Sequence, residues 1–362
     1  MLNLKAINSN AARRPAFSPS TDRLSISPNL NLHLHPNPAH SSNVHSQPAV
    51  VALVATRFRA EWLSRLLASL QQQTLRPLAA VVCDNGPDAG TLEAAKKSPL
   101  RCELVSPGKN LGFGGGLAAA GQRALERFPD LTHLLVVDDD TIFRPNDLKG
   151  LLAAAARHAA GAVAPLLIDV SGKLLEAPEP VSWNLARSLR KVGRNLDATR
   201  TLAPNGYPMA WCIGPCMLVD KATWLRAGPP RSDMLAYGDD VEFSLRLSAA
   251  SPAWAESSVT VVHDPPKPSA APLQGGADAM EGDPLDLRQE PSPERVAHYQ
   301  KFGILLQNLA FTCAVSPRPR HLPLYLPGNA RRFLQTFGWN AKNLWEVVRR
   351  YFLGLWGVPA GR

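Results

Sequence analysis

The sequence has few cysteines, and none of them stands in a spacing typical of a metal site. The five cysteines form no Cys-x-x-Cys pair and no Cys/His ligand pattern. This absence favours reduced, buried thiols in a cytosolic protein. Long apolar runs are also missing. None approaches the roughly 18–20 residues that a membrane-spanning helix needs.

The first thirty residues lack a basic segment followed by an apolar one, so we expect no secretory leader. We therefore expect a cytoplasmic protein, with any membrane contact being peripheral and on the inner face of the cell membrane. Residues 1–48 are rich in Ser, Asn, Pro and His without a hydrophobic period, which predicts a disordered N-terminal tail.

Two common phosphate-binding signatures are also lacking. The glycine-rich stretch 108–116 reads Gly-Lys-Asn-Leu-Gly-Phe-Gly-Gly-Gly. A dinucleotide fingerprint would need glycine at position 117, which is Leu117, and a P-loop would need Gly-Lys-Ser/Thr. Taken alone, the stretch predicts a flexible loop that leads into a helix whose amides could meet a phosphate.

What the chain does have is an alternation of apolar runs and helical periodicities. Predicted strands and helices follow one another from residue 49 to about residue 263, which indicates an α/β protein with a Rossmann-like, mostly parallel sheet flanked by helices. The predicted strands are 49–56, 78–83, 102–105, 134–137, 162–168, 211–219 and 259–262. The predicted helices are 63–70, 91–97, 117–127, 145–157, 221–227 and 241–247.

Three consecutive carboxylates, Asp138, Asp139 and Asp140, directly follow the predicted buried strand at 134–137. Ligands of open α/β sheets bind at the carboxyl ends of the strands. Adjacent carboxylates repel one another unless a cation or solvent relieves the repulsion. One interpretation is a divalent metal held by Asp138 and Asp140, whose side chains point the same way in an extended segment. The other is an acidic, solvated turn.

A second acidic pair, Asp239 and Asp240, comes just before the predicted helix at 241–247. The dipole and free amides of a helix amino terminus favour one such carboxylate as a cap, but two are more than a cap needs. The preceding Tyr-Gly is similar to the metal-binding turn of viral polymerases. A helix follows here instead of a strand, so we expect no nucleic-acid partner.

The C-terminal part differs in composition from the rest. Residues 266–293 are rich in Pro, Gly and acids and predict a mobile loop. Residues 294–362 are helical in pattern and basic, and from residue 317 there are eight Lys or Arg against one acid. Basic residues beside Trp and Leu predict a helix lying on a membrane surface; the alternative is a helix packed on the protein with a basic outer face.

The order of these motifs in residues 49–265 resembles the family-2 glycosyltransferases, whose GT-A fold binds nucleotide sugars, and most of all their rhamnosyl- and galactofuranosyl-transferring members. The sequence departs from the family pattern at Phe58 (usually Asn), Pro87 (Ser), Ala89 (Asp) and Asp239 (Glu). The resemblance rests on Val-Ala-Thr-Arg-Phe-Arg at 54–59, Asp-Asn-Gly-Pro-Asp-Ala-Gly-Thr at 84–91, Asn-Leu-Gly-Phe-Gly-Gly-Gly at 110–116, the triplet at 138–140, the pair at 239–240, and His263.

This resemblance implies a metal-dependent, inverting glycosyltransferase in cell-wall or exopolysaccharide synthesis. It would move a sugar such as galactofuranose or rhamnose from a UDP- or dTDP-linked donor to a hydroxyl of a glycan or lipid-linked glycan. The alternative is a non-catalytic protein of the same fold that binds sugar nucleotides or polysaccharide; such a protein would not need the second acidic pair.

The resemblance also implies roles for individual residues. Asp240 would be the general base, and Asp239 would orient the acceptor hydroxyl beside Trp211. Mn²⁺ or Mg²⁺ would bind to Asp138, Asp140 and His263. Donor contacts are implied for Thr56, Arg59, Asp84, Asn85, Asn110, Gly112, Gly115, Asp138 and Asp139.

Overall fold

The computed structural model describes residues 48–86, 88–214, 216–234, 238–265, 307–308, 310–312, 329–331, 333–335 and 341–355. The predicted disordered tail, apart from residue 48, and the predicted loop at 266–293 lie outside these residues. Among the described helices, none has the length and hydropathy that crossing a bilayer requires.

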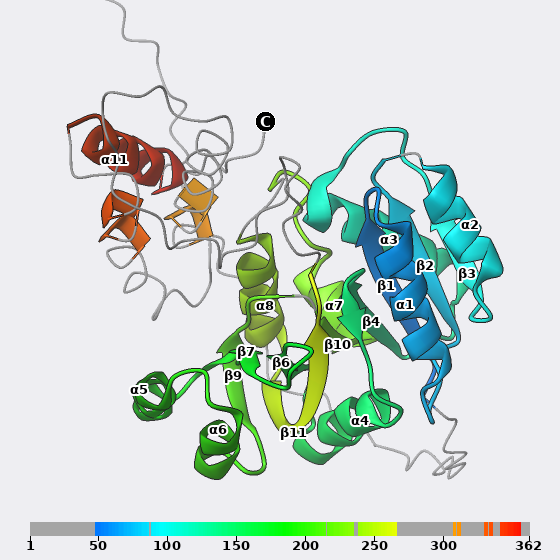
Figure 1. Ribbon diagram of the computed structural model, residues 1–362, viewed down its shortest axis with the longest axis horizontal. Helices are drawn as coiled ribbons and strands as arrows, with labels where there is room; N and C mark the ends of the chain where they lie inside the picture. Colours follow the sequence, from blue (N-terminus) through cyan, green and yellow to red (C-terminus); the bar gives the residue numbers. More distant parts are fainter. Residues whose placement is uncertain are drawn as a thin grey trace, which may run out of the picture. The chain divides into compact units, whose positions relative to one another are not determined.

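One half of the sheet is parallel, as the alternating pattern predicted. Its neighbouring strands are joined by helices, so each strand enters the sheet in the same direction (Figure 1). In sheet order the strands are β3 (Cys102–Val105), β2 (Ala79–Asp84), β1 (Val50–Thr56) and β4 (His133–Asp138), and the helices are α1 (Ala60–Gln71), α2 (Ala89–Lys97) and α3 (Gly112–Arg127).

The other half is mixed, because one antiparallel strand separates β4 from the next parallel pair. The order continues with β10 (Cys216–Asp220), β6 (Ala162–Ile168), β11 (Ala253–His263), β9 (Tyr207–Trp211) and β8 (Glu179–Pro180), while β5 (Thr141–Ile142) pairs with β11 and β7 (Leu174–Glu176) pairs with β6. The helices here are α4 (Asp147–His158), α5 (Trp183–Val192), α6 (Leu196–Leu202), α7 (Lys221–Ala227) and α8 (Asp239–Ala250), and α11 (Ala341–Leu355) lies in the C-terminal part.

The single strand predicted at 211–219 is wrong. The chain turns at Gly214, whose φ is +109°, and the segment divides into the end of β9 and the start of β10. The two strands pair with different neighbours, β9 with β11 and β10 with β4. An apolar run cannot reveal such a turn when the residues on both sides of it are buried.

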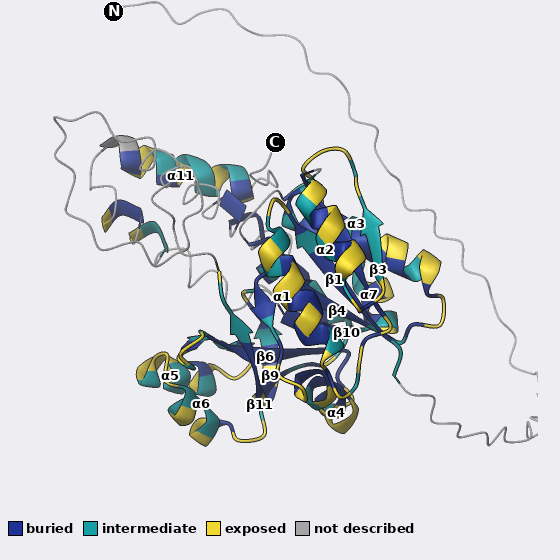
Figure 2. Ribbon diagram, turned by 45° about the vertical axis from the view of Figure 1, so that its right-hand side comes forward, coloured by how far each residue is buried: buried dark blue, intermediate teal, exposed yellow. Residues whose placement is uncertain are grey.

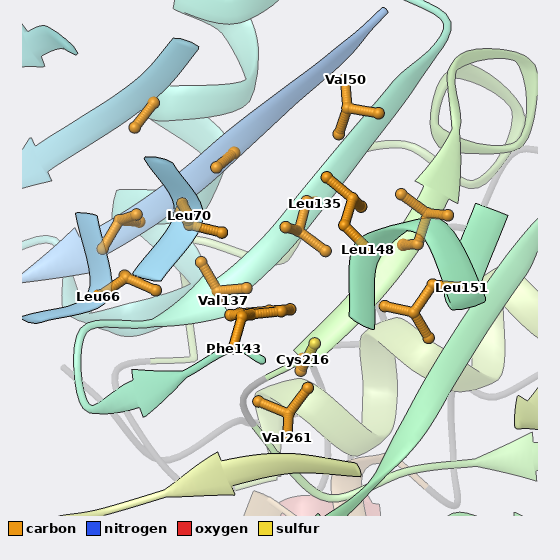
Figure 3. Close-up of a cluster of buried hydrophobic side chains, with 14 of the residues drawn as sticks. Val50, Leu66, Leu70, Leu135, Val137, Phe143, Leu148, Leu151, Cys216 and Val261 are labelled. Atoms are coloured by element: carbon orange, nitrogen blue, oxygen red, sulfur yellow. The ribbon is translucent and has the colours of Figure 1, made fainter. Parts of the chain in front are cut away.

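Both faces of the sheet are buried. In β1, Val50, Ala52 and Val54 face one cluster, and Val51 and Leu53 face the other. The first cluster is covered by α1 and α4, as Figure 3 shows for Leu66, Leu70, Leu148 and Leu151, and the second by α3, α7 and α8. In Figure 2 the strands are accordingly buried, whereas α1 exposes its outer side. A continuous apolar run in a strand is the expected result of burial on two faces.

The glycine-rich stretch is mostly helix, and the prediction of a flexible loop over 108–116 is wrong from Gly112 onward. Helix α3 begins at Gly112 and includes Gly114 and Gly116. A Cβ at Gly114 would lie 2.6 Å from the carbonyl oxygen of Arg231, and one at Gly116 would lie 2.9 Å from Asn85 Nδ2. These glycines therefore permit close packing at the start of the helix instead of supplying flexibility.

Candidate active site

Three side chains from distant parts of the chain meet beyond the carboxyl end of β4. Asp138 ends β4, Asp140 lies in the turn after it, and His263 ends β11, where it pairs with Thr141 of the short strand β5. One ligand atom from each of the three lies within 4.8 Å of the others. The separation between His263 Nε2 and Asp140 Oδ1 is 3.2 Å.

The chemistry of this group fits a divalent cation. Asp138 Oδ1 is buried and accepts no hydrogen bond from the part of the chain that the structure describes, while Asp140 Oδ1 faces His263 Nε2 at 3.2 Å. Buried carboxylate oxygens ordinarily have partners, so an orphaned one beside a carboxylate and an imidazole fits a bound ion. Two carboxylates and a histidine suit Mn²⁺ or Mg²⁺.

Electrostatics within the triplet differ from one carboxylate to the next. Burial, followed by repulsion from Asp140, Asp139 and Asp240, raises the pKa of Asp138 well above its usual range. Burial also opposes the ionisation of Asp140, but His263 and Arg59 together hold the pKa of Asp140 below its usual value. The contribution of Asp240 to the pKa of Asp138 places the second acidic pair near the first group.

Asp139 is held in a different environment from its two neighbours. It accepts a hydrogen bond from Thr56 Oγ1 at 2.6 Å and one from Arg59 Nη1 at 2.9 Å. Arg59 also contacts Asp140 Oδ2 at 2.9 Å. Thr56, Arg59 and Asp139 thus tie the end of β1 to the turn after β4 and set the position of Asp140.

Among the residues predicted to bind the donor, Asp84 and Asn85 are buried and have structural partners. Asp84 accepts hydrogen bonds from the amides of Gly86 and Asp88, so it shapes the turn after β2. The Asn85 side chain accepts from the Leu111 amide and donates to the Gly112 carbonyl, which fixes that turn to the start of α3. Their predicted contact with a donor stays a prediction.

Two further predicted donor residues lie at the same helix start. Asn110 is exposed, and its side chain accepts a hydrogen bond from the Gly112 amide. Gly112 has a φ of +74°, a conformation that glycine adopts without strain. A Cβ at Gly115 would meet the Leu111 side chain at 2.9 Å, so Gly115 serves packing. The structure brings these residues beside Asn85, at the carboxyl edge of the sheet.

The acidic pair stands at the amino terminus of α8, as predicted. Asp239 Oδ2 accepts a hydrogen bond from the Gly114 amide at 3.1 Å, and Asp240 Oδ2 accepts one from the Gly214 amide at 2.8 Å. Burial and then repulsion from Asp240 raise the pKa of Asp239 to about 7, and burial raises the pKa of Asp240 as well. Carboxyls whose pKa is raised in this way suit proton transfer.

Asp239 and Asp240 line a small pocket together with Phe113, Met217 and Phe243. Trp211, predicted to contact the acceptor, is only 6% exposed and packs against Val241 and Leu245 of α8. Its acceptor role stays a prediction, since the described residues leave little of its ring accessible.

Residues 51–214, a little under half of the chain, match the family model described as glycosyl transferase family 2. An N-acetylglucosaminyl-diphospho-decaprenol L-rhamnosyltransferase of Mycobacterium tuberculosis is 29% identical to it over 204 residues, which are 52% of this chain and 66% of that relative. The match thus spans just under two thirds of the relative's length.

Solved structures support a GT-A fold for this chain. Residues 1–349 of S. aureus TarS superpose with a TM-score of 0.52 at 14% identity, over 85% of this chain and 81% of that one. The mannosyltransferase PcManGT from Pyrobaculum calidifontis, solved with GDP-Man and Mn²⁺, superposes with a TM-score of 0.50 at 16% identity, over 86% and 88% of the two chains. At these identities the likeness shows the fold.

Sequence reasoning missed the backbone groups that hold the acidic pair. The amides of Gly114 and Gly214 bind Asp239 and Asp240, yet Gly114 belongs to α3 and Gly214 to the turn between β9 and β10. No residue type marks a backbone amide in the sequence. The available signal was the presence of glycine at both positions, which permits close approach of another chain segment.

Proposed function

We propose that this chain is an inverting glycosyltransferase that moves a sugar from a nucleoside diphosphate sugar to an acceptor hydroxyl. The observation that carries this proposal is the meeting of two acidic groups at one edge of the sheet. One, with His263, brings three potential ligand atoms together and includes the orphaned Asp138 Oδ1. The other, Asp239 and Asp240, has carboxyl pKa values raised by burial.

Asp138, Asp140 and His263 would hold Mn²⁺ or Mg²⁺. Such an ion, when bound, neutralises the diphosphate that leaves as the glycosidic bond to the donor breaks. The histidine ligand favours Mn²⁺ slightly over Mg²⁺. Arg59, which contacts Asp140, keeps that carboxylate ionised and in place.

Asp240 is the proposed general base. An acceptor hydroxyl is a weak nucleophile, so a carboxylate must accept its proton as attack on the anomeric carbon proceeds. The amides of Gly214 and Val241 each donate to one Asp240 oxygen, so the carboxylate is held in one orientation. Asp239, tied to α3, would orient the acceptor hydroxyl. Attack opposite the leaving diphosphate inverts the anomeric centre.

The donor nucleoside is proposed to lie over the ends of β1 and β2, beside the turn shaped by Asp84 and Asn85. This location leaves the diphosphate between the nucleoside and the Asp138–Asp140 group. The name of the mycobacterial relative supports rhamnose as the transferred sugar and a lipid-linked glycan as the acceptor. A UDP- or dTDP-linked donor and a role in cell-wall synthesis stay predictions.

Helix α11 supports a lipid-linked acceptor. Five apolar residues on one face are each at least half exposed: Leu344 (52%), Trp345 (65%), Val348 (50%), Phe352 (54%) and Leu355 (52%). Their spacing places them within about 100° of one another around the helix. The C-terminal part is also basic. We propose that this face lies on an anionic membrane surface, and a cytoplasmic location at the inner face stays a prediction.

The test is a panel of nucleotide sugars incubated with purified protein, Mn²⁺ and a polyprenyl-diphosphate-linked GlcNAc acceptor. We expect transfer from one donor, detected as an acceptor product heavier by one sugar, with inverted anomeric configuration by NMR. Binding of several donors without transfer or hydrolysis would instead support the non-catalytic alternative.

A further inference from the structure

Phe58 has an unusual backbone conformation at the edge of the site. Its φ is +55°, and among the described residues Ala159 is the other non-glycine residue with a positive φ. A bulky residue is strained in this region, because its Cβ crowds the backbone. Such strain persists only where the surroundings hold it, and it concentrates at ligand-binding sites.

The ring of Phe58 is also 58% exposed, although a phenyl ring is stabilised by burial. Its tip lies against the turn after β2, because a Cβ placed on Gly86 would lie 2.8 Å from Phe58 Cζ. The Arg57 guanidinium lies over the ring, 5.2 Å from its centroid. The strained backbone therefore holds a largely exposed aromatic ring, with Arg57 over it, beside the Asp84–Gly86 turn.

We propose that Phe58 is the surface on which the nucleobase of the donor stacks. The inference rests on the proposed function, because it places the nucleoside over this turn. A flat aromatic ring attracts another flat aromatic ring through its face, and neither a sugar nor a diphosphate offers one. An asparagine, which the resemblance leads us to expect at this position, has no such face.

The backbone strain at Phe58 predicts a second effect, on thermal stability, that does not depend on nucleotide binding. Phe58→Ala and Phe58→Gly both remove the ring, but only glycine adopts a φ of +55° without strain. We therefore expect F58G to melt at a higher temperature than F58A while binding nucleotide equally weakly. A Phe58→Tyr variant keeps an aromatic face and should keep nucleotide binding.

The experiment is isothermal titration of UDP, dTDP and inorganic diphosphate, each with Mn²⁺, into wild type, F58A, F58G and F58Y. The matched control is Leu78→Ala, which removes a 51% exposed apolar side chain next to the other end of β2. We expect F58A and F58G to bind the nucleotides about tenfold or more weakly, the loss typical of one base–aromatic stack. Inorganic diphosphate should bind to all the variants as to wild type.

The outcomes separate this inference from the proposed function. If the wild type binds no nucleotide, the proposed function fails. If the wild type binds UDP or dTDP and F58A binds it as tightly, the stacking role fails. If F58A weakens inorganic diphosphate as much as nucleotide, Phe58 supports the site as a whole and the stacking role is again overturned.

Discussion

Neighbouring carboxylates in the 138–140 triplet have different surroundings, although the residue type is the same. Asp139 is bound by Thr56 and Arg59, Asp140 by Arg59 with His263 beside it, and Asp138 keeps a buried oxygen without a hydrogen bond from the described residues. Asp138 ends β4, whereas Asp139 and Asp140 lie in the turn after it, where Arg59 reaches both. The functional interpretation of the triplet therefore fits Asp138 and Asp140 better than Asp139.

Asp240→Asn should reduce turnover while leaving donor binding intact. The amide keeps the size of the carboxylate and can still accept a hydrogen bond from the Gly214 amide, but it cannot accept the acceptor's proton. We expect kcat to fall by about 10²–10⁴ with little change in the KM for the donor. Steady-state kinetics should be compared with Asp197→Asn, an exposed acid in α6. Near-normal turnover in D240N would remove Asp240 from the chemistry.

Asp239→Asn should stabilise the fold, and more so at alkaline pH. Burial and the charge of Asp240 raise the pKa of Asp239 to about 7, so folding favours its protonated form. Its contribution to stability is full below a pH of about 4 and is lost as the pH rises through about 7. At pH 8 the wild type carries the whole penalty of a buried charge, and the asparagine variant does not.

Melting temperatures without metal at pH 5.5 and pH 8 measure this effect. The gain of D239N over wild type should be larger at pH 8. A gain that is the same at both pH values would mean that Asp239 does not titrate differently in the folded and unfolded chain.

The packing of helix α3 against helix α8 holds Asp239 and Asp240 in place. Helix α3 begins with glycines that allow the approach of Arg231 and Asn85, and its Gly114 amide binds Asp239 of α8. The two helices cover the same face of the sheet, so their packing fixes the distance between the pair and the end of β4. Helix α11 differs from α3 and α8, because it packs through Val347 on one side and leaves a second apolar face exposed.

Val348→Glu should weaken binding to anionic membranes. The substitution puts a negative charge in the middle of the exposed apolar face, where it opposes both burial in the interface and attraction to anionic lipid. Flotation with liposomes that contain phosphatidylglycerol should show a smaller bound fraction than wild type. Leu225→Glu is the matched control, since Leu225 is 59% exposed on α7. Equal losses for both variants, or none for V348E, would contradict the role of α11.

At the scale of the whole molecule, the site is built from β1, β2, β4, β11 and the start of α8, so a ligand that bridges them stabilises the entire fold. An ion held by Asp138, Asp140 and His263 joins the ends of β4 and β11. Binding to the folded state alone raises the free energy of unfolding in proportion to the logarithm of ligand concentration.

Mn²⁺ should therefore raise the melting temperature, and EDTA should reverse the rise. Titrations of Mn²⁺ up to about one hundred times its Kd should add roughly 2.7 kcal/mol to the free energy of unfolding. Asp138→Asn should abolish the increase, while Asp197→Asn should retain it. A melting temperature that does not respond to Mn²⁺ in the wild type would exclude this metal site.

The sequence by itself determined the order of the longer strands and helices from β1 to β6, the leucine face of α1, and the acidic residues at the end of β4 and the start of α8. These features depend on local hydrophobic periodicity, on the turn-forming residues between apolar segments and on residue type, all of which can be identified along the chain. The sequence did not predict the short elements β5, β7, β8, α5 and α6. The helical start of α3 was not readable, because glycine disfavours helix unless a close neighbour requires it. The division of 211–219 into β9 and β10 was hidden for a similar reason, since burial gives both strands the same composition.

Only the tertiary structure decided which groups meet. Asp140 and His263 are separated by more than a hundred residues in the chain, and they approach because β5 pairs with the end of β11. The pairing of Asp239 and Asp240 with backbone amides, and the strain at Phe58, likewise depend on contacts between distant segments. Such contacts arise from packing across the sheet, which a one-dimensional pattern does not contain.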